Sequence, residues 1–227
     1  MIRAIFYKEW IKLRWPVILL GFLAIAMLIN VWLSVMWDIK FREAHIYWVM
    51  VITNKQLFYH SLMFFPVIAG VLVAFFQFVP EVHQNRLKLS LRLPLTDRLI
   101  ILSMTSFGFL SLVGLFLFLL IGFVLLSSFY FPGEILTDIF WTILPWFLGG
   151  FCAYFLSTTI IIEPTWTRRI ILVPIAYGLI HTFFLAMNAF GSNAYSYRKS
   201  LLFFILITIF ASFTVYYAVH RYQKGVE

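Results

Sequence analysis

The sequence is short of charged side chains. Only 11% of its residues are Asp, Glu, Lys or Arg, whereas 63% are hydrophobic and 20% are aromatic. A soluble domain is about half apolar and about a quarter charged, so this chain lacks the polar residues needed to cover a water-facing globule. The composition therefore excludes a soluble enzyme, a disordered tail and a coiled coil, and it favours a protein whose solvent is the lipid bilayer.

Cysteine and nucleotide-binding motifs are scarce or missing. The single cysteine, Cys152, lies deep in an apolar run, so an intramolecular disulfide and a cysteine-based metal cluster are excluded. There is no glycine-rich phosphate loop and no Gly-Lys-Ser or Gly-Lys-Thr triplet, so we do not expect the chain to bind and hydrolyse ATP itself. We predict no catalytic residue, no metal and no cofactor.

Long apolar runs are what the sequence does contain. A helix needs about 20 apolar residues to cross a hydrocarbon core of about 30 Å. Six stretches qualify, and none contains Asp, Glu, Lys or Arg: Pro16–Trp37, Leu57–Val79, Leu99–Leu126, Ile139–Ile162, Ile170–Phe190 and Ser200–Val219. We predict an all-α polytopic membrane protein with six transmembrane helices, forming a single transmembrane domain over residues 1–227. The lack of acidic and basic residues in these stretches disfavours a carrier driven by an ion gradient.

Positive charge is distributed unevenly between the predicted loops. Six spans place both termini on one side, and that side carries 12 of the 17 Lys and Arg residues. Because cationic loops stay on the cytoplasmic side, we predict a multi-pass protein of the cytoplasmic (inner) membrane with both termini in the cytoplasm. This orientation explains the formal net charge of +8, and we predict no nucleic-acid partner.

Residues 1–15, before the first span, mix apolar and basic side chains. Basic residues flank a broad apolar face, which favours a short helix lying in the membrane interface. The residues that characterise it are Lys8, Glu9, Trp10 and Lys12. Glu9 falls on the apolar side, and its spacing from Lys12 allows an i,i+3 ion pair. A basic topology anchor is the alternative interpretation of this segment.

The loop 80–98 is the one inner segment of any length. Leucine occurs at every second position from Leu87 to Leu95, and strict alternation taken alone favours a strand. A lone strand in a membrane loop would have no edge to pair with, whereas a short helix ended by Pro94 satisfies its own backbone groups. We therefore predict a short helix held between the membrane surface and a protein partner.

This loop resembles that of the permeases of the type-2 ABC exporter family. Many of those permeases carry an acidic residue after the second span, then a leucine-rich segment that ends in Leu-Pro-(small)-Arg or a close variant. The matching positions here are Glu81, Leu89, Leu91, Leu93, Pro94 and Arg98. Tyr7-Lys8-Glu9-Trp10 is similar to the amphipathic segment that precedes their first span, and the six-span plan extends the resemblance over the whole chain.

The resemblance implies a transmembrane subunit of an ABC transporter. Two such subunits, identical or different, would pair around a central path, and the loop 80–98 would be a coupling helix docked on a separate soluble ABC ATPase subunit. The residues implied for the ATPase contact are Glu81, Arg86, Lys88, Leu89, Leu91, Arg92, Pro94 and Arg98. The alternative for each cation is that it only sets the orientation of the chain in the membrane, because the excess of inner cations would be the same with or without an ATPase contact.

The sequence therefore predicts a permease subunit of an ATP-driven exporter, which is not itself an enzyme. Its predicted partners are the ATPase, a second permease subunit and membrane lipid, and its charge-free, aromatic-rich interior suits a hydrophobic or amphipathic cargo. Two alternatives remain: an assembly subunit without a transport path, and an integral lipid-processing enzyme using groups such as Glu81, Glu163 and His83. A haem between His60 and His181 is disfavoured, because we expect these two histidines at different depths.

Overall fold

The computed structural model describes residues 2–41, 49, 51, 57–83, 96–131, 133–189 and 200–224, most of which are helical. The long helices are α1 (Ile2–Phe41), α3 (Phe65–His83), α5 (Asp97–Ser128), α6 (Gly133–Ile162), α7 (Trp166–Ala189) and α8 (Leu201–Lys224). A short 3₁₀ helix, η1 (His60–Leu62), precedes α3.

Six helical segments are long and apolar enough to cross a membrane. Each overlaps one of the six stretches identified in the sequence, although α3 begins at Phe65 rather than at Leu57. The all-helical, six-span prediction is therefore confirmed at this level. The physical reason is that a continuous apolar run can enter lipid only if its backbone groups bond to one another, which a helix achieves within itself.

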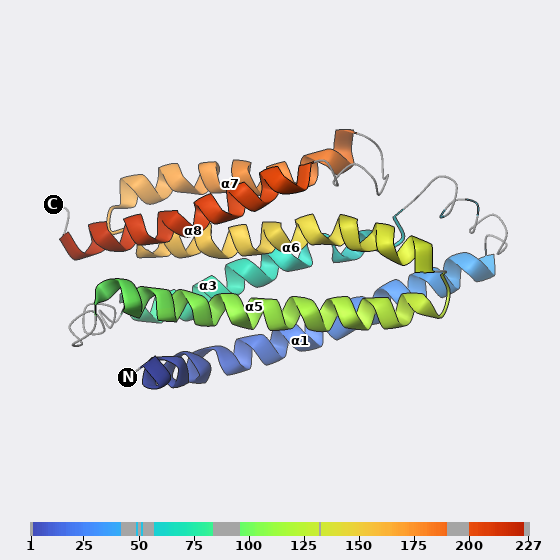
Figure 1. Cartoon of the computed structure of the whole chain (residues 1–227), viewed down its shortest axis with the longest axis horizontal. Helices are drawn as coiled ribbons and strands as arrows, with labels where there is room; N and C mark the ends of the chain where they lie inside the picture. Colours follow the sequence, from blue (N-terminus) through green and yellow to red (C-terminus); the bar gives the residue numbers. More distant parts are fainter. Residues whose placement is uncertain are drawn as a thin grey trace.

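The helices run up and down in a bundle with α6 at its centre (Figure 1). Helix α6 packs against α3, α8, α7 and α5, whereas α1 packs against α5 and α3. Both chain ends lie at the same end of the bundle (Figure 1). We call this end, where α1, α5 and α7 begin and α3, α6 and α8 finish, the polar end.

The contact between α3 and α6 is the most extensive in the bundle, and it depends on glycine. A Cβ atom added to Gly150 would lie 2.6 Å from the carbonyl oxygen of Pro66, and one added to Gly70 would collide with the carbonyl group of Gly150. A Cβ atom added to Gly149 would lie 3.4 Å from the side chain of Phe183, which is an ordinary contact. Small residues thus let the backbones of α3 and α6 approach each other closely.

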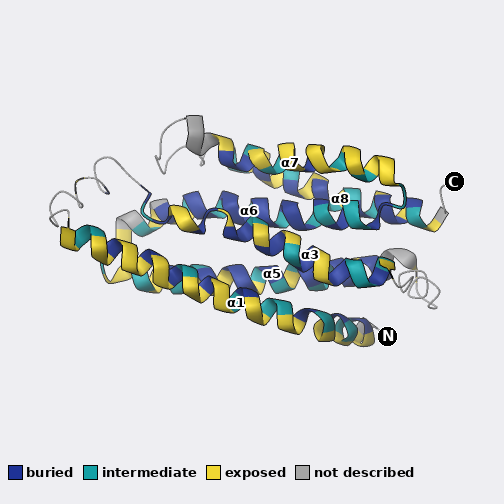
Figure 2. Cartoon of the chain, turned by 180° about the vertical axis from the view of Figure 1, so that it is seen from behind, coloured by how far each residue is buried: buried dark blue, intermediate teal, exposed yellow. Residues whose placement is uncertain are grey.

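The outer surface of the bundle is apolar along its length. In the most apolar stretch of α6, 72% of residues are buried, against 17% in that of α7. Exposed residues follow the outward faces of α1 and α7 (Figure 2), and they include Phe22, Ile170 and Tyr177. An exposed apolar surface of this extent is suited to lipid rather than water, so we infer a multi-pass membrane protein.

Two helices continue past the boundaries expected from the sequence. Helix α1 includes residues 2–15 of the N-terminal segment and the first span without a break, although Pro16 lies inside it. Its first turns, dark blue in Figure 1, run in a different direction from the rest, and a proline inside a helix is a common cause of such a bend. Helix α3 likewise passes through Pro80 to His83, so residues 80–83 are helical.

Candidate functional site

Charged side chains are buried at the polar end of the bundle. Glu9 on α1 and Gln77 and Glu81 on α3 have no exposed surface. Lys12 on α1 is 15% exposed and Lys8 is 38% exposed. The two lysines and two glutamates balance in charge, as a buried ionic group requires.

Glu81 connects the end of α3 to α1. Its Oε1 atom accepts a hydrogen bond from Lys12 Nζ at 2.8 Å, and its Oε2 atom accepts one from Lys8 Nζ at 3.1 Å. Lys12 Nζ also donates to Glu9 Oε1 at 2.5 Å, which confirms the i,i+3 pair expected from the sequence. Lys8 and Lys12 are four residues apart on one helix, so both reach the same carboxylate from the same face.

Gln77 extends this network to the other helices. Its Nε2 atom donates to Glu9 Oε2 at 3.0 Å and to the Met104 carbonyl of α5 at 2.7 Å. Its Oε1 atom accepts a hydrogen bond from the Tyr154 hydroxyl of α6 at 2.8 Å. Gly108 on α5 leaves the space for these groups, because an added Cβ there would collide with the Tyr154 hydroxyl and Gln77 Oε1. Four helices therefore meet in one polar network.

A second ionic cluster lies at the polar end, where α6 finishes and α7 begins. Arg221 of α8 donates from Nη1 to Glu163 Oε1, and both residues are almost fully buried. Thr165 Oγ1 donates to the same oxygen at 3.1 Å. Arg169 donates to the carbonyl oxygens of Glu163 at 2.7 Å and Ile161 at 3.2 Å. These bonds satisfy backbone acceptors that the end of α6 would otherwise leave unpaired.

The predicted ATPase-contact residues divide into three groups. Glu81 is fully buried inside the chain, beside the lysines of α1, rather than exposed at the surface. Arg98 lies in the first turn of α5, but its side chain is outside the described residues. Arg86, Lys88, Leu89, Leu91, Arg92 and Pro94 also lie outside the described residues. The described residues that flank this segment, His83 and Thr96, lie at the same end of the bundle as the buried network.

The residues predicted for an interfacial helix do not share one environment. Trp10 is 53% exposed, whereas Glu9 is completely buried. Glu9 lies on the apolar side of the helix because that side faces α3, where Gln77 is its partner, and Lys12 of α1 itself also bonds to it. The separate interfacial helix is not distinguished from the first span, since both belong to α1.

Sequence reasoning missed Gln77, Tyr154, Gly108 and the Glu163–Arg221 pair. Of these residues, Gln77 could have been noticed in the sequence, because an amide side chain is unusual within an apolar span and needs a hydrogen-bond partner there. The partners themselves lie on helices distant in sequence. Only the packing of α3 against α5 and α6 reveals them.

Other reactive side chains do not form a site in the described part of the chain. No group of three His, Cys, Asp or Glu residues is arranged to hold a metal ion there. Cys152 is fully buried, whereas His60 and His181 are both exposed. The two polar clusters at one end of the bundle are therefore the candidate functional features.

Comparison with known proteins adds no assignment, since no protein-family model, curated protein or solved structure matches this chain.

Proposed function

We propose that this chain is the membrane-spanning permease subunit of an ATP-driven transporter of the type-2 ABC exporter kind. It works in the cytoplasmic membrane with both termini in the cytoplasm, and it pairs with a second permease subunit. ATP is hydrolysed by a separate ATPase subunit that binds the segment between α3 and α5. The cargo is a hydrophobic or amphipathic molecule, which suits apolar stretches that contain no Asp, Glu, Lys or Arg.

The observation that carries the proposal is the position of Glu81. It lies three residues before the start of the segment 84–95 and is bonded to Lys8 and Lys12 of α1. Breaking a buried ion pair by removing one partner costs about 3–5 kcal/mol. A force applied to this segment by a partner protein is therefore transmitted to α1 rather than absorbed by local movement of the end of α3.

The rest of the network carries such a movement further into the bundle. Gln77 lies one helical turn before Glu81 and bonds to α5 and α6. Displacement of the end of α3 would then move α1, α5 and α6 along with it, as a coupling element must. The first turns of α1 fit an interfacial segment in this scheme, because Trp10 and Trp15 are exposed beside the basic Arg14.

The test is co-purification of the tagged chain from its native membrane in mild detergent, followed by mass spectrometry. A soluble ATPase in stoichiometric amount is the expected result. Reversal of the three loop cations, Arg86→Glu, Lys88→Glu and Arg92→Glu together, should abolish this association while the variant remains monodisperse.

A matched control reverses three cations at the same end of the bundle, Arg3→Glu, Arg14→Glu and Arg168→Glu, all on exposed side chains. This control has the same net charge as the loop variant and should retain the ATPase. Absence of any ATPase from a monodisperse wild-type preparation would contradict the proposal and favour an assembly subunit or a lipid-processing enzyme. Retention of the ATPase by the loop variant would exclude the coupling role of the loop.

A further inference from the structure

A groove lies at the polar end between α3, α6 and α7. It has a volume of about 410 Å³. Its walls are aliphatic and come from all three helices: Val79, Val82, Ile160, Ile161, Ile170 and Val173. The remaining lining residues are His83, Trp166 and Arg169, so cationic and aromatic groups join an otherwise apolar surface.

The lining residues of α7 show that the polarity of the groove changes along its length. Trp166, Arg169, Ile170 and Val173 are spaced as i, i+3, i+4 and i+7, so they form one face along about 10 Å of the helix axis. Trp166 begins the helix at the polar end, whereas Val173 lies two turns deeper in the apolar region. The groove is therefore polar where it opens at the membrane surface and aliphatic where it enters the bilayer.

Arg169 is fixed in position but retains unused donors. Its guanidinium group donates from Nε and Nη2 to two backbone carbonyls of α6 and the turn after it. It also lies over the ring of Trp166, 5.4 Å from the ring centre. A guanidinium group has five N–H donors, so three remain in the described structure for an additional acceptor. A fixed guanidinium group of this kind is well suited to a phosphate.

The charge around the groove is positive. Glu163, the acidic residue nearest in sequence to Arg169, is already engaged by Arg221 and Thr165. The first turn of α7 contains no acidic residue and instead carries Arg168 and Arg169. Cations at the start of a helix oppose its macrodipole, so an anion at this position would relieve an unfavourable interaction.

We propose that this groove binds one anionic phospholipid. Its phosphate accepts hydrogen bonds from Arg169 and His83, and one acyl chain lies between the aliphatic walls on α3, α6 and α7. The aliphatic lining selects a lipid over free phosphate, and the excess of cations selects an anionic headgroup over a zwitterionic one. The site does not depend on the proposed ATPase partner, because all of its residues belong to this chain.

The test uses the full chain, delipidated in detergent and titrated with phosphatidylglycerol or with phosphatidylcholine of the same acyl chains. Native mass spectrometry should show one tightly retained phosphatidylglycerol, preferred over phosphatidylcholine by about tenfold, because the cations around the groove attract its net negative charge, whereas the choline cation cancels the phosphate charge of phosphatidylcholine. Inorganic phosphate at millimolar concentration should not compete with it.

Three variants locate the site. Arg169→Gln should remove most of the preference, and Val173→Trp should fill the groove from an exposed position and reduce retention of phosphatidylglycerol. Arg14→Gln removes an exposed cation of α1 that does not line the groove and should leave the preference unchanged. Because Arg169 also bonds to α6, Val173→Trp is the decisive variant if Arg169→Gln fails to fold. Equal binding of the two lipids, competition by inorganic phosphate, or wild-type retention in Val173→Trp would overturn the proposal.

Discussion

Glu81 of α3 and Lys12 of α1 are 69 residues apart in sequence, yet they form a 2.8 Å ion pair at the polar end of the bundle. The carboxylate is completely buried and the lysine side chain is 15% exposed. Such a pair is stable only while its charges and hydrogen bonds remain balanced. The pair thus joins the end of α3 to the first turns of α1.

Glu81→Gln and Lys12→Met should each destabilise the fold by about 3 kcal/mol, because each leaves an uncompensated buried charge. The double variant restores the charge balance and should cost less than the sum of the two by about 1–3 kcal/mol. Equilibrium unfolding in mixed detergent micelles measures these free energies. Arg14→Met, which removes an exposed cation from the same helix, should change stability by less than about 0.5 kcal/mol. Simple additivity of the two single changes would contradict the pairing.

Gly150→Ala should destabilise the contact between α3 and α6 by about 1–3 kcal/mol through overpacking. The added methyl group would lie 2.6 Å from the Pro66 carbonyl oxygen and 2.8 Å from the ring of Phe116. Gly21 is the matched control, since nothing lies within 4 Å of a Cβ added there. Gly21→Ala should be neutral or stabilise α1 by about 0.5–1 kcal/mol. Thermal unfolding followed by circular dichroism distinguishes the two, and an equal loss in both variants would refute the close contact.

Cys152 should react with a membrane-permeable maleimide only when the bundle opens. The thiol is fully buried on α6, the central helix, so we expect modification at least about a hundredfold slower in the folded protein than in denaturant. Mass spectrometry of the intact chain gives the rate. Rapid labelling of the folded protein would show that α6 is not packed as described.

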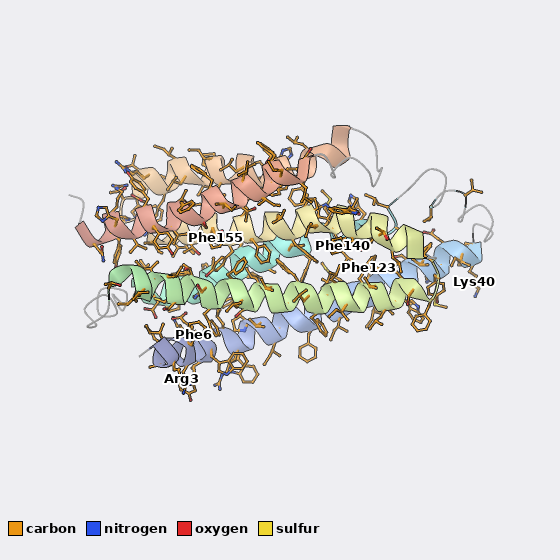
Figure 3. The ribbon with its side chains drawn as sticks, viewed as in Figure 1. Arg3, Phe6, Lys40, Phe123, Phe140 and Phe155 are labelled. Carbon is orange, nitrogen blue, oxygen red and sulfur yellow. The ribbon has the colours of Figure 1, made fainter. Side chains whose placement is uncertain are left out.

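Cysteines placed at the two ends of α1 should be labelled from opposite sides of the membrane. Arg3 and Lys40 lie at opposite ends of the bundle (Figure 3). In a Cys152→Ala background, an impermeant maleimide applied to intact cells should label Lys40→Cys but not Arg3→Cys, which should react after the cells are opened. The reverse pattern would invert the predicted orientation. Labelling of both positions in intact cells would mean that α1 does not cross the membrane.

The boundaries of the helices show where sequence patterns lose precision. The apolar run from Pro16 predicts where hydrocarbon is crossed, but α1 begins at Ile2, before that proline. A helix can accommodate a proline with the loss of one hydrogen bond and a bend, so neither Pro16 nor Pro80 ends the helix that contains it. The short helix predicted within the loop 80–98 stays a prediction, because residues 84–95 lie outside the described structure.

The polar network shows a second limit of prediction from the sequence. Glu9 already stands out in the sequence, since it lies on the apolar side of its helix. That anomaly predicts a partner but does not identify Gln77, which is 68 residues away. The pairing of Glu163 with Arg221 is likewise absent from any local pattern, because it requires α8 to return beside the end of α6.

The sequence by itself determined the number of spans, the helical class and the apolar surface, because hydrophobicity and run length act locally and set what can enter a bilayer. Only the tertiary structure decided that Glu81 faces Lys12 and that Tyr154 reaches Gln77. It also decided that Arg169 lines a groove with Val79. Those relationships depend on the rotation and neighbours of each helix, and these are fixed by packing, such as the contact of Gly150 with Pro66, rather than by composition.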